Sequence, residues 1–251
     1  MVAWIDAFAS GRQIGRGLFH AAWYERYEGN SHATFRLDHQ ELPDTILGFL
    51  PKSMTWRMLR LFNRPSGMKA INAAKYRASR TLGSGRPHPQ SLVEFSFLLD
   101  YVPHWQRAYR HGFVQIQAFV PKEAARTAFQ RILEESHRLK MVATLAVMKR
   151  HRPDRYLLSH GVDGYSLALD YACRPGRERV LRQLHERIAQ TVLESGGRFY
   201  PAKDSLLDAG TYQRSLGAET VARFQLERDA WDPGGLLDTE LTRRLWPRSG
   251  V

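Results

Sequence analysis

The sequence predicts an α+β fold in which helices cover one face of an antiparallel sheet. Three observations support this prediction: segments 112–121 and 164–172 alternate in polarity as half-buried strands do, helical spacing follows each of them, and another strand-like run, 141–149, lies between them. Strands bury every second residue and helices every third or fourth, so the two kinds of element can be told apart over segments of this length.

The first strand and its helix occupy residues 112–139. In GFVQIQAFVP, Gln115 and Gln117 share one face and the apolar Val114 and Ile116 share the other. Two amides that point in one direction either meet water or line a polar pocket, and the pattern alone leaves both interpretations open. An amphipathic helix is expected next, because apolar residues recur at helical spacing at Ala125, Ala128, Phe129, Ile132 and Leu139.

The same order of elements then repeats. MVATLAVMK (141–149) and GYSLALDYA (164–172) predict two strands, the following helix ends at Gly196-Gly197, and 198–202 predicts a short strand. Strand, helix and strand, taken twice, form two split β-α-β units. A ferredoxin-like domain with helices on one face of its sheet is therefore expected.

The segments on either side are less regular. A strand is expected at 2–8, a turn at GRQIGRG (11–17) and a helix at 52–62. Glycine and proline interrupt regular structure at 64–67, and a loop or turn is expected at 83–89. The tail predicts two short helices and a last one at 236–246. The chain is thus expected to have three parts: a poorly defined N-terminal part (1–95), the split β-α-β domain (96–205) and a helical C-terminal tail (206–251).

The composition favours a globular protein with an anionic partner. The 251 residues include 37 Lys and Arg against 25 Asp and Glu, a net charge of +12, which suits phosphate, nucleic acid or a lipid surface. The basic residues are spread along the chain and match no nucleic-acid-binding motif, so specific nucleic-acid binding is not expected. Neither a signal peptide nor a membrane-spanning run is readable, and the expected location is the cytoplasm.

Motifs for metal binding, disulfide formation or common hydrolases are absent from the sequence. Cys173 is the only cysteine, the ten histidines lack zinc-site spacing, and neither G-x-S-x-G nor a dinucleotide-binding glycine motif occurs. His20, His104 and His160 could each act as a lone base, although most such histidines are structural or exposed. Lys149 at the end of one strand and Lys203 after another suggest an anionic site, because a fixed ammonium stabilises negative charge.

Two segments carry a specific family pattern. LLDYVPHWQRAYRHGFVQIQAFVP (98–121) is similar to P-L-D…W-N-R-A-Y…G-F-x-Q-Y-Q-F-x-x-P, and GGRFYPAKDS (196–205) is similar to G-G-R-x-Y-x-A-K-D-S. These patterns resemble the C-terminal substrate or cap half of vanillyl-alcohol-oxidase-type FAD-linked oxidoreductases, most closely the decaprenylphosphoryl-β-D-ribose 2'-oxidase group. The likeness spans nearly the whole chain apart from 18–70, with weaker matches at 2–17, 75–80, 160–172 and 232–245.

The resemblance implies the substrate-binding part of an FAD-dependent enzyme that oxidises a secondary alcohol of a sugar to a ketone. Polyprenyl-phosphate-linked ribose is the substrate it suggests, with peripheral contact at the inner face of the membrane. Lys203 would be catalytic, beside the pyrimidine end of the isoalloxazine, where it stabilises the anionic reduced flavin. The other implied contacts are those of Tyr200, Ala202 and Lys203 with FAD, and those of Tyr76, Gln115, Gln117 and Lys149 with substrate.

The sequence departs from the family pattern at two points. Ala168 stands where the family has a strand cysteine, and no flavin-binding domain is readable, so FAD is expected to be shared with a separate or missing FAD-binding domain or subunit. Two alternatives stay open. One is part of an alditol or aldonolactone oxidase, which Tyr200-Pro201 disfavours because those enzymes usually place histidine and tryptophan there; the other is a non-catalytic basic α+β binding module.

Overall fold

The computed structural model describes residues 1–24, 34, 36–46, 50–82, 85 and 87–248. Contacts divide the chain into two compact units. One unit comprises Met1 and Leu18–Phe113, and the other comprises Val2–Gly17 and Val114–Val251. The predicted boundaries after residues 95 and 205, which divide the chain by expected role, stay predictions.

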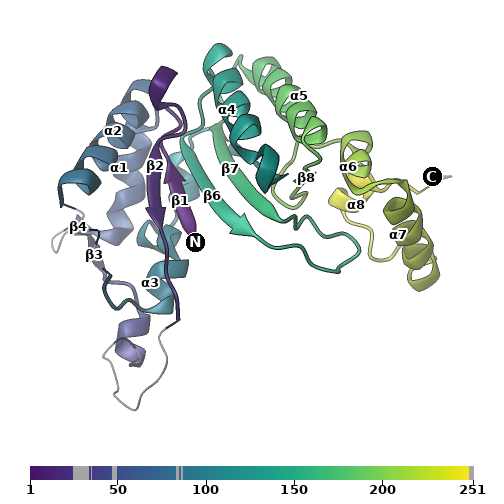
Figure 1. Ribbon diagram of the computed structural model, residues 1–251, viewed down its shortest axis with the longest axis horizontal. Coiled ribbons are helices and arrows are strands. Elements are labelled where there is room, and N and C mark those ends of the chain that lie inside the picture. The colour runs from purple at the N-terminus through teal and green to yellow at the C-terminus, as the bar shows by residue number, and fades with distance from the viewer. Residues whose placement is uncertain (25–33, 35, 47–49, 83–84, 86, 249–251) are drawn as a thin grey trace. The chain divides into compact units, whose positions relative to one another are not determined.

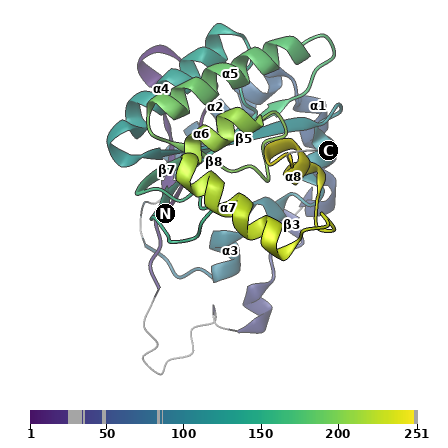
Figure 2. The same ribbon diagram turned by 90° about the vertical axis from the view of Figure 1, so that its right-hand side faces the viewer.

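The second unit contains the predicted split β-α-β arrangement (Figures 1 and 2). The six-stranded antiparallel sheet has the order β2-β1-β6-β7-β5-β8, so β7 lies between β6 and β5. Helices α4 (Lys122–Arg138) and α5 (Glu178–Glu194) lie side by side on one face, which confirms the predicted fold class. The strands are β1 (Val2–Ile5), β2 (Gly17–His20), β5 (Phe113–Pro121), β6 (Leu145–His151), β7 (Gly164–Ala172) and β8 (Arg198–Phe199).

The core of this unit lies between the two helices and the sheet. Ile116 of β5 and Leu167 of β7 are fully buried there, together with Ile132 of α4 and Leu184 of α5. Burying one such aliphatic side chain stabilises the fold by about 1.5–3 kcal/mol. Since alternate strand residues supply this layer, the residues between them form the opposite face of the sheet.

Several predicted boundaries were wrong. Strand β6 begins at Leu145 rather than 141, after a short non-strand stretch that follows the left-handed Lys140 (φ 51°), and it continues past residue 149 to His151. Strand β8 ends at Phe199, since Pro201 has no N–H with which to extend the ladder. Strand β1 ends at Ile5 rather than residue 8.

The Gly/Pro interruption predicted at 64–67 lies at a break in the helical structure, at Asn63 and Arg64, and helix α2 (Pro65–Leu82) begins inside the predicted range. Proline is favoured in the first turn of a helix, where its missing N–H leaves no hydrogen bond unmade. The turn predicted at 83–89 lies partly outside the described residues. The turn predicted at 11–17 is confirmed between β1 and β2 and contains a short 3-10 helix, Gly11–Gln13.

The first unit is mainly helical. Besides α2 it contains α1 (Thr55–Phe62), which confirms most of the helix predicted at 52–62, α3 (Leu92–Ser96) and a small hairpin of β3 (Thr45–Ile46) and β4 (Leu50–Pro51). Asn63, at the end of α1, donates its Nδ2 to the carbonyl of Ala108 at 2.9 Å. None of the helices in the described ranges is long and apolar enough to cross a membrane.

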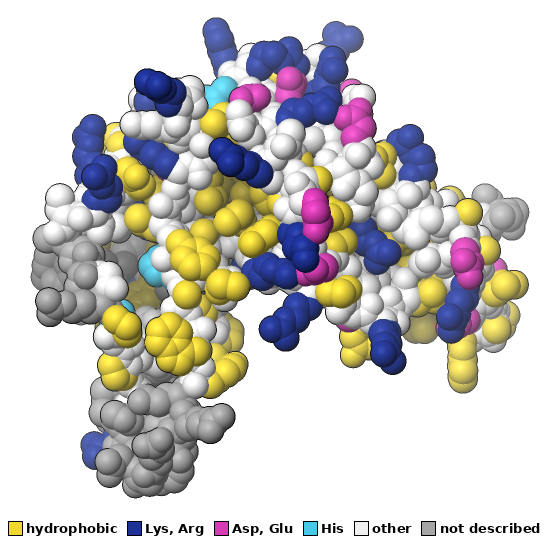
Figure 3. Space-filling model, viewed as in Figure 1, with side chains coloured by type: hydrophobic (Ala, Val, Ile, Leu, Met, Phe, Trp, Pro, Cys, Tyr) yellow, Lys and Arg dark blue, Asp and Glu magenta, His cyan; other side chains and the backbone are white. Residues whose placement is uncertain are grey.

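Basic side chains are dispersed over the molecular surface shown in Figure 3. Lys and Arg side chains stand singly or in small groups on that face, with Asp and Glu side chains among them. The net charge of +12 is therefore not gathered into one continuous stripe on the face drawn. The sequence likewise spreads its basic residues along the chain, with local clusters at 148–155 and 174–187, rather than in one tail.

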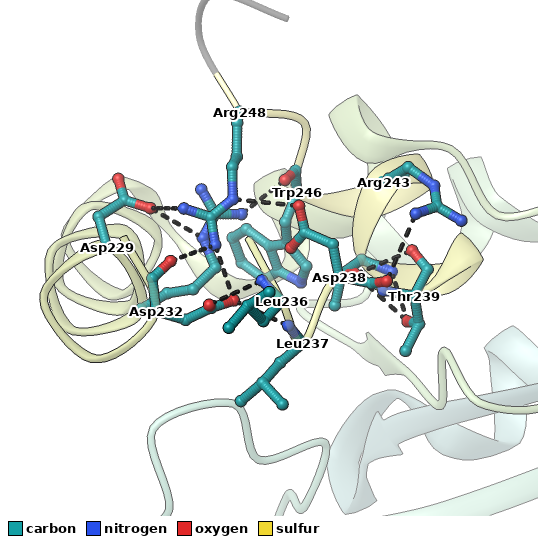
Figure 4. A network of polar contacts seen from close by, with 11 residues as sticks. Asp229, Asp232, Leu236, Leu237, Asp238, Thr239, Arg243, Trp246 and Arg248 are labelled. Carbon is teal, nitrogen blue, oxygen red and sulfur yellow. Dashed lines mark hydrogen bonds and ion pairs between the residues drawn. The ribbon is translucent and has the colours of Figure 1, made fainter. Parts of the chain in front are cut away.

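The C-terminal tail forms three helices, as predicted: α6 (Ala209–Leu216), α7 (Ala218–Trp231) and α8 (Glu240–Leu245). The guanidinium of Arg248 joins the segments around α7 and α8, because it pairs with Asp229, Asp232 and Asp238, each at 3.1 Å (Figure 4). Asp232 in turn accepts the backbone N–H groups of Leu236 and Leu237 (Figure 4). The link between the two helices is thus held by a connected polar network.

Candidate functional site

The face of the sheet opposite α4 and α5 is rich in polar groups. Gln115 and Gln117 of β5 point to this face because their neighbours Val114 and Ile116 are buried in the core. The β6–β7 register pairs Lys149 directly with Ser166, which brings β6 and β7 side chains to the same face. We call this surface the polar sheet face; its residues are Gln115, Gln117, Phe119, Lys149, His151, Ser166 and Asp170.

Both predicted glutamines are hydrogen-bonded to β7. Gln117 is only 7% exposed, and its Nε2 donates to Oγ of Ser166 at 3.1 Å. The Nε2 of Gln115 donates to Oδ1 of Asp170. The interpretation that these amides simply meet water is therefore wrong for Gln117. Two cross-strand bonds fix the orientation of the pair, and the Oε1 atoms accept no hydrogen bond from the described residues.

Lys149 and Lys203 bring two ammonium groups to this region. Lys149 lies within β6 rather than at its end, and Lys203 lies in the turn after β8. Both are exposed, and neither forms an ion pair with a carboxylate of the described residues. The pKa of Lys203 is lowered, first by partial loss of hydration and then by the charge of Lys149, whereas Asp170 acts in the opposite direction. A bound anion would relieve the repulsion between the two lysines.

A buried carboxylate fixes the loop that carries Lys203. Asp204 is 1% exposed, and its Oδ2 lies 2.9 Å from Nε2 of His185 on α5. Its Oδ1 accepts the backbone N–H groups of Leu206 and Leu207 at 3.0 and 3.1 Å. The aspartate of the K-D-S sequence is therefore structural, while the lysine before it stays available to a ligand.

Two histidines complete a row of rings beside the polar sheet face. His151 places Nε2 at 2.8 Å from Oγ of Ser166, and its ring centroid lies 4.7 Å from that of Phe119. His160 packs between Phe119 at 4.6 Å and Tyr200 at 4.7 Å. Burial is the main reason why the pKa of each histidine is lowered. Both imidazoles are therefore neutral at neutral pH.

His151 and Asp170 also belong to this surface, although neither was predicted from the sequence. His151 stands two residues after Lys149, and that spacing would have placed it on the same face had the strand been extended past residue 149. Asp170 alternates with apolar residues in the predicted strand 164–172, which is the same signal. His160 lies in the loop before β7, where no periodicity indicates direction.

The remaining predicted site residues are placed as follows. Tyr200 donates its backbone N–H to the carbonyl of Gln117 at 3.3 Å, and Nζ of Lys203 lies 5.7 Å from its ring centroid. Ala202 is exposed in the same turn. Tyr76 lies on α2 in the other unit, with the guanidinium of Arg80 6.0 Å from its ring. The cofactor and substrate roles of all the predicted residues stay predictions.

Thiol chemistry has no place on the polar sheet face. Ala168 lies between Ser166 and Asp170 on β7, at the position where the family pattern has cysteine. Cys173 instead packs against the hydrophobic core, and burial raises the pKa of its thiol. The described residues also contain no group of three or more His, Cys, Asp or Glu that could hold a metal ion.

Comparison with known proteins points to an oxidase. No family model matches the sequence. The chain is 32% identical over 168 residues to the decaprenylphosphoryl-β-D-ribose oxidase of Mycolicibacterium smegmatis. The chain is related to this oxidase. The match covers 66% of this chain and 35% of that protein, so the chain spans about a third of the length of the curated relative it matches. The finer prediction, that the match lies in the C-terminal half of the relative, stays a prediction.

Proposed function

We propose that this chain is the substrate-binding part of an FAD-dependent oxidoreductase that oxidises a secondary alcohol of a sugar to a ketone. The observation that carries the proposal is the pair of ammonium groups of Lys149 and Lys203, which lie without described carboxylate partners beside the fixed amides of Gln115 and Gln117. The similarity to a ribose oxidase supports the same class of reaction.

The turn after β8 has the chemistry to meet the cofactor. FAD, when bound, supplies the electron sink for the oxidation. Lys203 would hold FAD together with Tyr200 and Ala202 of the same turn. These residues suit FAD because the ammonium group of Lys203 has no described carboxylate partner and a lowered pKa. A positive charge fixed there stabilises the negative charge that the cofactor gains, and the Asp204 anchor keeps that charge in place.

The polar sheet face would orient the sugar. The Oε1 atoms of Gln115 and Gln117 are acceptors for sugar hydroxyl groups, and their positions are fixed because Nε2 of each glutamine is bonded to β7. Holding one hydroxyl group in a single orientation raises the rate of oxidation, because the entropy cost of aligning the reacting groups is met when the substrate binds. Lys149 would meet an anionic group of the substrate, such as the phosphate of a polyprenyl-phosphate-linked ribose.

A separate FAD-binding domain or subunit is part of this proposal. The sequence has no G-x-G-x-x-G motif, and the match covers 35% of the related oxidase. Tyr76 is proposed as a further substrate contact from the first unit, on the family resemblance alone. A lipid-linked substrate also implies action at the inner face of the membrane, where the net charge of +12 favours contact with anionic lipid.

The test uses the assembled flavoprotein, that is, this chain purified together with the domain or subunit that binds FAD. Anaerobic mixing with decaprenylphosphoryl-β-D-ribose is expected to bleach the flavin absorbance and to yield one keto-sugar per FAD reduced. Alditols and aldonolactones are the comparison substrates, and bleaching by these alone would favour the alternative oxidase class. If none of these alcohols bleaches the flavin, the proposed function is wrong.

A non-catalytic module is the second candidate, and the exposure of both lysines favours it. An exposed ammonium group such as that of Lys149 can bind a phosphate without any cofactor. This candidate predicts that the chain binds phosphorylated sugars and that Lys203→Ala leaves ligand binding unchanged. Lys203→Ala distinguishes the two candidates: the oxidase predicts slower flavin reduction in the assembled flavoprotein, whereas the module predicts only unchanged binding of D-ribose 5-phosphate, measured by isothermal titration.

A further inference from the structure

His160 occupies a defined place beside the polar sheet face. Its ring lies between Phe119 of β5 and Tyr200 of the turn after β8, with centroid distances of 4.6 and 4.7 Å. Nζ of Lys203 lies 5.7 Å from the centroid of the same Tyr200 ring. His160, on the β6–β7 loop, and Lys203, in the turn after β8 that is proposed to hold the cofactor, therefore both lie against Tyr200.

The β6–β7 loop is built to hold this histidine. Asp154 accepts the hydroxyl of Ser159 at 2.7 Å, and the same hydroxyl oxygen accepts the backbone N–H of Gly161 at 2.8 Å. Arg198 of β8 donates to the carbonyl of Ser159 at 2.6 Å and so ties the loop to the sheet. A Cβ at position 161 would lie 3.0 Å from Asp154 Oδ2 and 3.1 Å from the carbonyl oxygen of Arg152, so a larger residue would fit only after its neighbours shifted slightly.

The ring nitrogens of His160 differ from those of the other buried or half-buried histidines of this unit. His151 is bonded to Ser166, His185 to Asp204, and His137 to the backbone carbonyls of Ala7 and Ala9. His160 forms no hydrogen bond within the described residues. Its loop and ring contacts fix its position while both nitrogens stay open to a ligand.

We propose that His160 is the base that accepts the proton of the sugar hydroxyl during oxidation. The inference rests on the proposed function and names a catalytic group for it. When the alcohol is oxidised, the carbon loses hydrogen and two electrons as a hydride to the flavin oxidant, the hydroxyl loses its proton to a nitrogen of His160, and the carbonyl double bond forms. One neutral imidazole becomes one imidazolium, so the proton and charge balance.

The surroundings of His160 suit a base that starts neutral. Burial lowers its pKa and so does Arg198, whereas Asp154 opposes them and would stabilise the imidazolium. His151, whose ring also packs against Phe119, adds a positive charge when protonated, and Tyr200 contributes an aromatic ring. At a pH above the lowered pKa of His160 the neutral ring can accept a proton. Below that pKa the ring is already protonated, so the reaction rate must decrease as the pH decreases.

The experiment compares wild type with His160→Phe and His160→Gln in the assembled flavoprotein. His160→Phe retains the packing between Phe119 and Tyr200 and removes both nitrogens, so it separates acid-base chemistry from packing. Reduction by decaprenylphosphoryl-β-D-ribose is expected to slow about 10²–10⁴-fold in both variants, and the acidic limb of the pH profile is expected to disappear. His111→Asn, at an exposed position in the first unit, is the matched control and retains the wild-type profile.

A second measurement uses the chain without cofactor. The ring signals of His160, assigned by their loss in His160→Phe, are expected to titrate below the usual value of about 6.5 in a histidine-labelled sample. A ring that is charged at pH 7, or a folded His160→Phe variant with wild-type rate and acidic limb, overturns the inference. Wild-type protein that sugar alcohols do not reduce refutes instead the proposed function on which the inference rests.

Discussion

The buried contact between Asp204 and His185 should account for a large share of the stability around the Lys203 turn. Asp204→Ala removes three hydrogen bonds: the 2.9 Å contact with His185 and the bonds from the backbone N–H groups of Leu206 and Leu207. Breaking a buried pair by deleting one partner costs about 3–5 kcal/mol, because the remaining polar group stays buried and unsatisfied. The two amides are part of the same loss and are not added to it.

Asp204→Asn separates the parts of this contribution. Asparagine keeps an oxygen for the N–H groups of Leu206 and Leu207 and turns its amide nitrogen toward His185. It is therefore expected to lower the free energy of unfolding by only about 1–2 kcal/mol, the range for a weakened hydrogen bond between partners that stay paired.

The assay is urea unfolding of the full chain followed by circular dichroism, with stability taken from the midpoint and slope. Asp163→Ala is the control, because Asp163 is an exposed carboxylate paired with Lys122 and Arg150, and its loss should move the midpoint far less. A loss below about 1 kcal/mol in Asp204→Ala would show that the buried pair does not hold the turn, and the reasoning from burial would then be wrong.

Three further predictions follow from other parts of the structure. Arg248→Ala should speed hydrogen exchange of the Leu236 and Leu237 amides, since Asp232 then loses the cation that holds it in place. Arg223→Ala, which removes an exposed ion pair, is the control and should leave these exchange rates unchanged. Equal exchange rates in both variants would count against the network. The pKa values of His151 and His160 are lowered in the folded chain, so the unfolded chain binds more protons between those values and about 6.5. The contribution of the two neutral rings to the free energy of unfolding should therefore be fully present above that pH range and be lost as the pH drops through it. The loss should be smaller in His160→Phe, and unfolding measured as a function of pH checks this. The chain purified alone should be colourless, and stoichiometric bound flavin in its absorbance spectrum would contradict a separate FAD-binding portion.

The part of the fold with a clear period was predictable from sequence. Segments 112–121 and 164–172 alternate strictly enough that β5 and β7 fall within one residue of their predicted bounds. Helices α4 and α5 follow from their apolar stripes. The start of β6 was not predictable in this way, because residues 141–144 continue the apolar pattern of the strand and yet lie outside it.

In the candidate site, too, the positions that follow strand periodicity were predictable and the contacts set by tertiary packing were not. Gln115 and Gln117 share a face by alternation alone, and the structure adds the bonds to Asp170 and Ser166 that no local pattern contains. The position of His160 depends on a loop tied to β8 by Arg198, a contact 39 residues apart in sequence. Contacts of this kind are set by tertiary packing, and one sequence gives no periodic signal for them.

The central claim is that Lys203 provides the positive charge for flavin-linked oxidation of a sugar. The most direct measurement is the rate constant for anaerobic flavin reduction by decaprenylphosphoryl-β-D-ribose in the assembled flavoprotein, for wild type, Lys203→Ala and Lys122→Ala. Lys122 is an exposed lysine on α4, already paired with Asp163, and serves as the control. If Lys203 provides this charge, the rate constant falls about 10²–10³-fold in Lys203→Ala and is unchanged in Lys122→Ala. Reduction at the wild-type rate in Lys203→Ala would contradict it.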